Sequence, residues 1–359
     1  RTVSRGLGDV YKRQTLMCAL LLAIGCRPVD PKHEVTTLVL EYPAHFPEPT
    51  LPLDNELTEE GVLLGRHLFY DVRLSGDNTQ NCNSCHRQES NFAEPTPYST
   101  GIDGIDGNIN AMVLSNLAWQ DFFFWDGRDG SLEDQVKEPI VNPIEMHSQW
   151  PDVIDKIEQD LTYNELFSKA FGTTEVSKEK VAKALSQFIR TLVTGTSSLD
   201  SYIEGSYSFS SSEQKGFDLF NGEQGDCFHC HGLATTGYQM GAFGLLQFSN
   251  NGLDSIYQTG DGREAVTGSA FDRGKFKIPS LRNIEYSFPY MHDGRFQTLA
   301  EVVDFYNLGG HLYATIDPNM KAAGSGRNWS EVEKKGLIDF MKTFSDPTFL
   351  MDTSFSSPW

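Results

Sequence analysis

Apolar residues recur at helical spacing in four separate runs, and much of the remaining chain shows no regular pattern. Because residues three and four apart share one face of a helix, each run predicts a helix with one buried side. The apolar residues of the four runs are Leu64, Leu68 and Phe69; Val153, Ile154, Ile157 and Leu161; Val181, Leu185, Phe188, Ile189 and Leu192; and Leu337, Phe340, Met341 and Phe344. Few segments alternate in the manner of strands, so the predicted fold is mainly α.

Polar residues mark where these helices should begin. Thr58, Ser148 and Ser177 precede the first three runs, and Ser330 with Glu333 has the spacing of a capping box. Residues 196–212 are rich in Ser, Gly and Tyr and are expected to link two domains, whereas residues 232–275 form a Gly-rich loop. A loop of that length usually has a function or wraps around a cofactor.

Two Cys-x-x-Cys-His motifs lie far apart in the chain. They consist of Cys82, Cys85 and His86, and of Cys227, Cys230 and His231. This is the attachment signal for c-type haem: the two thiols add across the haem vinyl groups, and the histidine ligates the iron. A four-cysteine zinc site or two disulfides would use the same cysteines, but neither needs a histidine after each second cysteine. The motifs therefore favour two covalent haem c groups, with His86 and His231 as iron ligands.

The composition is that of an acidic globular protein. The chain has 359 residues, enough for two domains, and a formal net charge of -20. Such a charge argues against nucleic acid and anionic membrane surfaces as partners, and it suits a small basic or mixed-charge redox protein.

The first 40 residues predict export. Residues 1–14 resemble a translated sequencing adapter, so the native start is expected upstream, and residues 15–25 have the apolar core of a signal peptide. Gly25-Cys26 resembles a lipoprotein cleavage site, which predicts a lipid anchor on Cys26, a tether over residues 26–40 and a periplasmic location; an ordinary cleaved signal peptide is the alternative. Of six cysteines, Cys18 and Cys26 fall in this leader, and the haem motifs use the other four.

A weak internal repeat precedes the two motifs. Gly65 to Phe69 and Gly216 to Phe220 both read Gly-x-x-Leu-Phe, and a helix cap is expected at Ser211 or Ser212 before the second copy. The repeat predicts two cytochrome c-like domains, over residues 41–200 and 201–359, each with one haem.

Further motifs follow in a fixed order. They are Phe124-Trp125-Asp126-Gly127-Arg128, then Gln135 and Glu145, then Pro279-Ser280-Leu281-Arg282-Asn283, Pro289-Tyr290-Met291-His292-Asp293-Gly294-Arg295-Phe296, and the run from Leu299 to Asn307. With these motifs the chain resembles the bacterial dihaem cytochrome c peroxidase family, including its MauG-like branch, from about Asn55 to Phe344.

The resemblance implies roles that the residues alone do not. The haem on Cys82 and Cys85 would react with hydrogen peroxide, and Glu145 would move the proton between the peroxide oxygens with Gln135 beside it. Trp125 would lie between the haems, and the second haem would take up electrons. Asn110, Ser287 and Pro289 match the positions that hold a calcium ion. Without the resemblance, Glu145 reads as a solvated loop carboxylate and Trp125 as a packed aromatic.

Three positions depart from the typical family pattern. Ile102 stands where most peroxidase members have a histidine that blocks the first haem. Tyr306 stands at the axial methionine of the second haem, where the MauG-like branch has a tyrosine; a core tyrosine, with Met291 or Met320 as the ligand, is the alternative. Gly225 stands where MauG has a surface tryptophan.

Two enzyme functions remain open from the sequence. The first is a peroxidase that reduces hydrogen peroxide with electrons from a small redox protein such as cytochrome c or a cupredoxin. The second is a MauG-like enzyme that oxidises Trp or Tyr residues of a partner protein. A plain electron carrier would need neither Glu145 nor Gln135.

Overall fold

The computed structural model describes residues 33–232 and 247–359, and within them it contains all four predicted helices. Helix α2 (Glu59–Phe69) begins at Thr58, whose hydroxyl accepts a hydrogen bond from the Gly61 amide. Helix α8 (Lys178–Arg190) begins after Ser177, and α14 (Glu331–Lys342) begins with a capping box between Ser330 and Glu333. The signal-peptide core and Cys26 lie outside the described residues, as does part of the Gly-rich loop.

The second predicted helix is shorter than its apolar run. Helix α6 (Trp150–Glu158) begins after Gln149 without a side-chain cap, so Ser148 does not start it. Leu161 was expected on its buried face, but it opens a separate helix, α7 (Leu161–Phe171), and is 82% exposed. The reason is local: the Asp160 carboxylate accepts from the Thr162 amide at 2.7 Å and begins a new helix there.

The other elements are short. The remaining helices are α3 (Cys82–Cys85), α4 (Leu132–Gln135), α5 (Glu138–Val141), α9 (Ser198–Ile203), α10 (Ser211–Asn221), α11 (Phe228–His231), α12 (Glu264–Thr267), α13 (Leu299–Leu308) and α15 (Pro347–Met351). Single 3₁₀ turns cover Val72–Leu74, Gln88–Ser90, Leu117–Trp119 and Ala270–Asp272. The described strands are β1 (Phe248–Ser249) and β2 (Phe276–Lys277), which pair antiparallel, so the fold is mainly helical as predicted. Among the described residues no helix is both long and apolar enough to cross a membrane.

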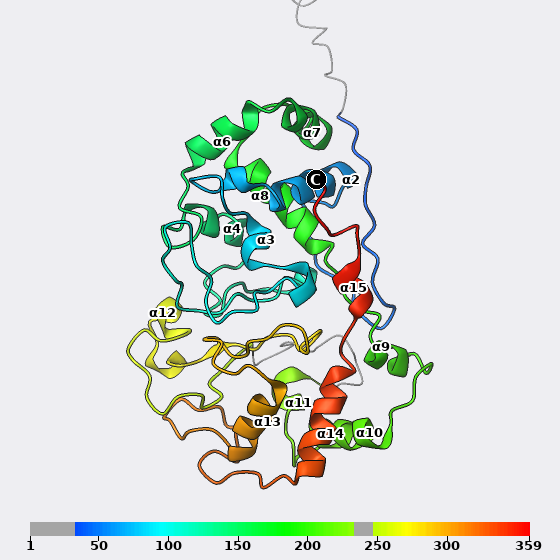
Figure 1. Ribbon diagram of the computed structural model, residues 1–359, viewed down its shortest axis with the longest axis vertical. Helices are drawn as coiled ribbons and strands as arrows, with labels where there is room; N and C mark the ends of the chain where they lie inside the picture. The colour runs from blue at the N-terminus through cyan, green and yellow to red at the C-terminus, as the bar shows by residue number, and fades with distance from the viewer. Residues whose placement is uncertain (1–32, 233–246) are drawn as a thin grey trace, which may run out of the picture. The chain divides into compact units, whose positions relative to one another are not determined.

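Two hydrophobic cores form around two helix pairs (Figure 1). Helix α2 packs on α8 in the first core, and α10 packs on α14 in the second. Both crossings depend on the glycine of the internal repeat: a Cβ on Gly65 would lie 1.9 Å from the Ala184 carbonyl oxygen, and one on Gly216 would lie 2.0 Å from that of Gly336. The repeat therefore has a physical basis, since only glycine permits either contact. Helix α10 is capped by Ser210, so neither Ser211 nor Ser212, the two expected positions, is its cap.

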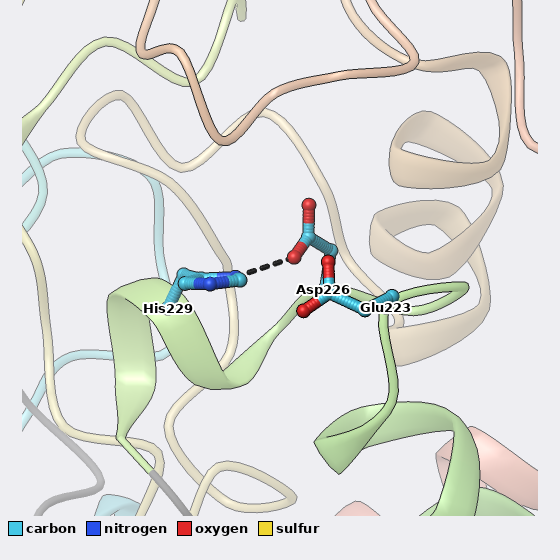
Figure 2. Close-up of side chains that lie close together, drawn as sticks. All are labelled: Glu223, Asp226 and His229. Atoms are coloured by element: carbon cyan, nitrogen blue, oxygen red, sulfur yellow. Dashed lines mark hydrogen bonds and ion pairs between the residues drawn. The ribbon is translucent and has the colours of Figure 1, made fainter.

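Helix α11 carries the second motif and is preceded by a tight polar turn. Asp226, with a positive φ of 61°, shares a hydrogen bond with His229, and Glu223 lies beside it (Figure 2). Lys321 pairs with both carboxylates, at 2.7 Å from Glu223 and 3.2 Å from Asp226. These contacts fix the backbone just ahead of Cys227.

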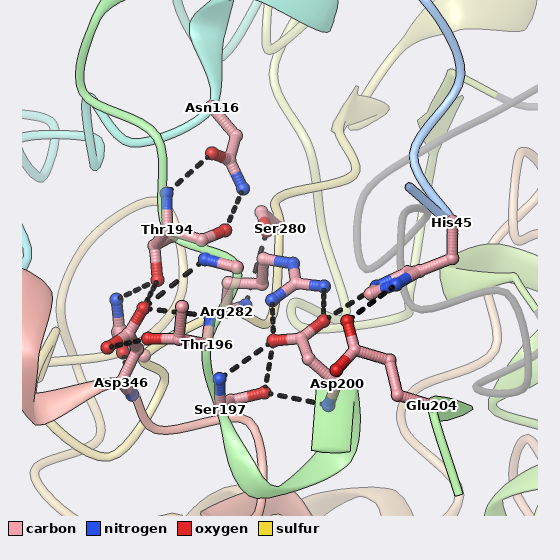
Figure 3. A network of polar contacts seen from close by, with 12 residues as sticks. His45, Asn116, Thr194, Thr196, Ser197, Asp200, Glu204, Ser280, Arg282 and Asp346 are labelled. Atoms are coloured by element: carbon pink, nitrogen blue, oxygen red, sulfur yellow. Dashed lines mark hydrogen bonds and ion pairs between the residues drawn. The ribbon is translucent and has the colours of Figure 1, made fainter. Parts of the chain in front are cut away.

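The stretch predicted as a linker is an ordered part of the protein. It contains α9, which begins with a capping box between Ser197 and Asp200. The Ser, Gly and Tyr content of the stretch predicted a linker and did not reveal this helix start. The Asp200 carboxylate is buried and accepts two hydrogen bonds from Arg282, at 2.7 and 2.8 Å, and lies 2.9 Å from Nε2 of His45 (Figure 3). Three segments distant in sequence therefore meet at one carboxylate.

The end of the chain returns to the first core. Phe349 and Leu350, in α15, pack among the residues of that core. Beyond them, the carbonyl oxygen of Phe355 accepts from the Tyr70 hydroxyl at 2.8 Å, and that of Ser356 accepts from Arg66 at 2.7 Å. The first core thus contains residues from both ends of the described body.

Candidate active site

The first Cys-x-x-Cys-His motif opens into a cavity of about 410 Å³. Cys82, Cys85 and His86 line it, and Nδ1 of His86 lies 2.9 Å from the Phe92 carbonyl oxygen. This contact engages Nδ1 and leaves Nε2 as the nitrogen for a metal. Burial lowers the pKa of His86, which keeps the ring in the neutral form that ligates iron.

Glu145 and Gln135 line the same cavity, as do Trp125 and Met146. Glu145 is half-buried, and its Oε1 accepts a hydrogen bond from the Asn142 side chain at 2.7 Å. Burial raises the pKa of Glu145, although the Asn142 hydrogen bond and the Arg128 charge oppose it. A carboxyl group whose pKa is raised holds its proton more readily than an ordinary one and can both accept and return it. The structure therefore brings Glu145 and Gln135 together, although Glu145 reads as a solvated loop carboxylate without the family resemblance.

Ile102 holds the backbone of Glu145 from outside the cavity. Its amide donates to the Glu145 carbonyl oxygen at 3.0 Å, and the preceding Gly101 lies so close that a Cβ would be 2.3 Å from the Ile144 carbonyl. His147, the nearest histidine to Glu145 in sequence, is 45% exposed and pairs with Asp103 at 2.5 Å. Neither residue lines the cavity, so neither offers a ligand to it.

Trp125 separates this cavity from a smaller one. Its side chain is buried, and its Nε1 donates to the Asn110 carbonyl oxygen at 2.8 Å. Its ring lies edge-on to His292, with 6.4 Å between the ring centroids. The smaller cavity is lined by Asn110, Ser287 and Pro289, the three residues expected to hold calcium, together with Trp125 and Lys277.

The second motif has different neighbours. Burial lowers the pKa of His231 to about 4, although a backbone contact with Pro279 opposes the shift, so this imidazole is also neutral. Tyr306 accepts a hydrogen bond from Asn251 at 3.1 Å, and the same Asn251 nitrogen lies 3.6 Å from the Met291 sulfur. The Tyr306 hydroxyl thus contacts a side-chain amide, whereas a plain core tyrosine was expected to contact a backbone carbonyl.

Tyr306 lies close to the cysteines of the second motif. Burial raises its pKa to about 12, and the charges that Cys230 and Cys227 would carry act in the same direction. Tyr306 is therefore positioned beside the attachment point of the second haem, and its hydroxyl is protonated in the absence of a metal.

The alternative uses of the four cysteines do not agree with the structure. All four are free thiols, so they form no disulfides. Within residues 33–232 and 247–359, the group with metal-ligand spacing is Glu223, Asp226 and His229 of Figure 2, which contains no cysteine. Lys321 already supplies a cation to that group. The four-cysteine zinc site is therefore excluded for the described residues.

Position 225 has no room for a side chain. Gly225 is buried, and a Cβ there would lie 1.8 Å from the Leu219 carbonyl oxygen. Trp329 lies nearby, with its Nε1 3.3 Å from the Gln224 carbonyl, but it is only 4% exposed. The surface tryptophan of MauG thus has no counterpart at this position.

Three residues of these sites were not anticipated. Asn142 and Asn251 donate to Glu145 and Tyr306, and Lys277 lines both cavities. Asn142 precedes a proline, and this pair predicts a turn, but the sequence does not show that the Asn142 side chain donates to Glu145. Lys277 was visible as a lone charge in the run Phe276-Lys277-Ile278-Pro279.

Comparisons with known proteins cover most of the described body. A family model described as di-haem cytochrome c peroxidase matches residues 59–208. Cytochrome c551 peroxidase of Nitrosomonas europaea is 36% identical over 305 residues, which are 83% of this chain and 84% of the relative. Methylamine utilization protein MauG of Methylorubrum extorquens is 34% identical over 294 residues, 81% of this chain and 80% of the relative.

A solved structure gives the same result in three dimensions. The crystal structure of a MauG-like protein associated with microbial copper homeostasis superimposes with a TM-score of 0.80 at 34% identity, over 90% of this chain and 99% of that one. The paired motifs, the cavity at the first of them and these likenesses together identify the chain as a member of the di-haem cytochrome c peroxidase family, and hence as an oxidoreductase.

Proposed function

We propose that this protein is an exported peroxidase that reduces hydrogen peroxide to water with electrons from a small redox protein, such as a cytochrome c or a cupredoxin. The observation that carries the proposal is the cavity at Cys82, Cys85 and His86, which also contains Glu145 and Gln135. Each peroxide consumes two electrons and two protons and yields two water molecules.

The family implies two haem c groups, and the residues present fit them. Cys82 and Cys85 would hold the first through thioether bonds and His86 would ligate its iron; Cys227, Cys230 and His231 would do the same for the second. When bound, haem supplies an iron that exchanges electrons with peroxide. The partly buried, neutral histidines, the free thiols and the cavity beside the first motif support this assignment. Two cytochrome c-like domains, over residues 41–200 and 201–359, remain part of the proposal. The two hydrophobic cores support the division into two, although Phe349 and Leu350 pack in the first core and Leu199 in the second.

Glu145 is the proposed proton carrier. Its carboxylate accepts the proton of the inner peroxide oxygen and returns it to the outer oxygen, which then leaves as water. Asn142 holds this carboxylate by the 2.7 Å hydrogen bond to Oε1. Gln135, on the same cavity wall, orients the peroxide by hydrogen bonding but cannot exchange a proton.

Trp125 and Tyr306 are the proposed residues of the electron path. Trp125 lines both cavities and lies edge-on to His292, so it connects the first motif with the second half of the chain. Tyr306 is the proposed sixth ligand of the second haem, as a tyrosinate held by the Asn251 amide. The cost of ionising the buried hydroxyl would be offset by the positive charge of ferric iron.

Calcium and the location of the protein complete the proposal. Asn110 donates through Nδ2 to the Thr96 and Pro97 carbonyls, which leaves Oδ1 to join the carbonyls of Ser287 and Pro289 around a calcium ion. The apolar run and Gly25-Cys26 support export to the periplasm and a lipid anchor on Cys26.

A second candidate function is the oxidation of Trp or Tyr residues in a partner protein. Tyr306 beside the second motif favours it, as does the likeness to MauG. The buried Gly225 argues against the surface route that MauG uses.

Steady-state assays with hydrogen peroxide and reduced cytochrome c distinguish these functions. Rapid, sustained oxidation of cytochrome c supports the peroxidase. Near-zero turnover together with a long-lived oxidised state of the haems contradicts it and favours the second function.

A further inference from the structure

Lys277 is a buried cation on the wall of two neighbouring cavities. The residue is 7% exposed, and it lines both the cavity of the first haem motif and the smaller cavity beside Trp125. A lysine is rarely buried to this extent unless an anion accompanies it, because removing an ammonium group from water is costly.

The described residues give Lys277 no anionic partner. Its Nζ donates to the Phe122 carbonyl oxygen at 3.1 Å, and no carboxylate of residues 33–232 or 247–359 lies within 4.0 Å of it. Lys275, two residues earlier, differs in this respect, since its Nζ pairs with Asp272 at 3.1 Å. Burial lowers the pKa of Lys277 to about 8, which leaves the ammonium form in the majority at neutral pH.

The backbone holds Lys277 in this place. Its amide donates to the Trp125 carbonyl oxygen at 2.7 Å, and its partner across the two-stranded sheet is Phe248. The ring of the preceding Phe276 stacks on His292 with 3.7 Å between centroids. These contacts fix the backbone of Lys277, and the Phe122 carbonyl oxygen accepts from its ammonium group inside the protein.

A haem attached to Cys82 and Cys85 would carry two propionate carboxylates, and Lys277 lines the cavity that these cysteines line. We propose that Lys277 binds a propionate of that haem and thereby raises its reduction potential. The proposal rests on the haem attachment argued above. A cation beside the haem stabilises the ferrous state, which carries one positive charge less than the ferric state. Lys277 is thus a positioning residue that acts on iron through the propionate.

The proposed contact would join a residue of the second half of the chain to the haem of the first half. Lys277 belongs to the segment that follows the second motif, yet it lines the cavity of the first. The electron affinity of the proposed peroxidatic haem would therefore depend on a residue that folds with the second half.

The test compares Lys277→Met with Lys275→Met in the haem-loaded protein. Both changes remove one lysine charge from the same segment, but only Lys277 lines the cavity. Haem content is measured first by the pyridine haemochrome assay. A redox titration then follows each haem, and resonance Raman spectra follow the propionate bending bands. We expect Lys277→Met to shift the potential of the first haem to more negative values and to move its propionate band, whereas Lys275→Met leaves both unchanged.

Lys277→Arg separates charge from packing, because it keeps a cation and should restore most of both signals. A wild-type potential and propionate band in Lys277→Met with two haems bound would overturn the proposal, as would a shift of the second haem alone. Fewer than two haems in the wild-type protein would instead contradict the proposed function. If Lys277→Met does not mature, a crystal structure of the wild-type holoprotein decides: the proposal fails if Nζ lies beyond hydrogen-bond distance of every propionate oxygen.

Discussion

The two Cys-x-x-Cys-His motifs have the same sequence pattern and different surroundings. The first opens into a cavity with Glu145 and Gln135 on its wall, and neither Ile102 nor His147 enters it. Beside the second, Tyr306 and Met291 share the Asn251 amide. In the proposed function the motif would attach a haem in either place, and residues far along the chain would decide whether that haem meets peroxide or only exchanges electrons.

The largest expected effect comes from removing one motif at a time. Cys82→Ser with Cys85→Ser should abolish covalent attachment of the first haem and all reduction of peroxide. Cys227→Ser with Cys230→Ser should leave the first haem attached but interrupt electron supply. Mass spectrometry counts the attached haems, and a stopped-flow mixing experiment with peroxide measures the reaction. The comparison breaks down if the first pair of changes leaves peroxide reduction intact.

Glu145→Gln tests the chemistry of the first region alone. An amide cannot carry the proton, so the rate of reaction with peroxide should fall about 10²- to 10⁴-fold while both haems remain bound. Glu165→Gln is the matched control, since Glu165 is exposed and pairs only with Lys169. A wild-type rate in Glu145→Gln would show that another group moves the proton.

Arg282→Met tests whether the two regions unfold together. It leaves the buried Asp200 carboxylate without its cation, and we expect a loss of about 3–5 kcal/mol in the free energy of unfolding. Removing both charges with Asp200→Asn should recover part of this loss. Unfolding is monitored by haem absorbance. If the two haem regions of Arg282→Met unfold in separate transitions, the contact between Asp200 and Arg282 couples them in the wild-type protein.

The same pair predicts a dependence on pH. Burial acts to raise the pKa of Asp200, but the Arg282 hydrogen bonds and charge overcome it and lower the pKa to about 2. The contribution to stability is therefore present above the ordinary carboxyl pKa and is lost as the pH falls toward 2. Acid titration of the wild-type protein and of the double variant should diverge in this range.

Tyr306→Phe tests the second region and should change the spectrum more than the stability. If tyrosinate is the ligand, the absorption spectrum of the second haem should change and its low reduction potential should rise, with Met291→Leu as the control. A methionine-type near-infrared band in the wild-type protein that persists in Tyr306→Phe would mean that methionine, and not Tyr306, is the ligand of the second haem, as in ordinary dihaem peroxidases.

The smallest expected effect concerns the spin state of the resting oxidised enzyme. Because neither Ile102 nor His147 lines the first cavity, electron paramagnetic resonance should show a high-spin ferric signal from the first haem. An entirely low-spin spectrum would mean that a protein ligand occupies the open side.

Local patterns carried the sequence predictions that succeeded. Two kinds of local feature were predicted correctly: the helix caps at Thr58, Ser177 and Ser330, and the glycine repeat. Both depend on residues that are close together in the sequence. Leu161 was placed wrongly because the Asp160 cap interrupts an otherwise helical run. The contacts of Asn251 and Lys277 could not be predicted, because their partners come from segments that only the folded chain brings near. Glu145 was found through family resemblance, since neither its burial nor its Asn142 partner is visible in the sequence.

The return of the last residues to the first core has a consequence for the order of assembly. Phe349 and Leu350 pack there, and Lys277 lines the first cavity. A ribosome synthesises the first haem motif before Lys277, Phe349 and Leu350, so the motif leaves the ribosome before the residues that enclose it. The cavity wall is complete only once Lys277 has been made, and a chain that stops before Phe349 keeps this wall but lacks part of the first hydrophobic core.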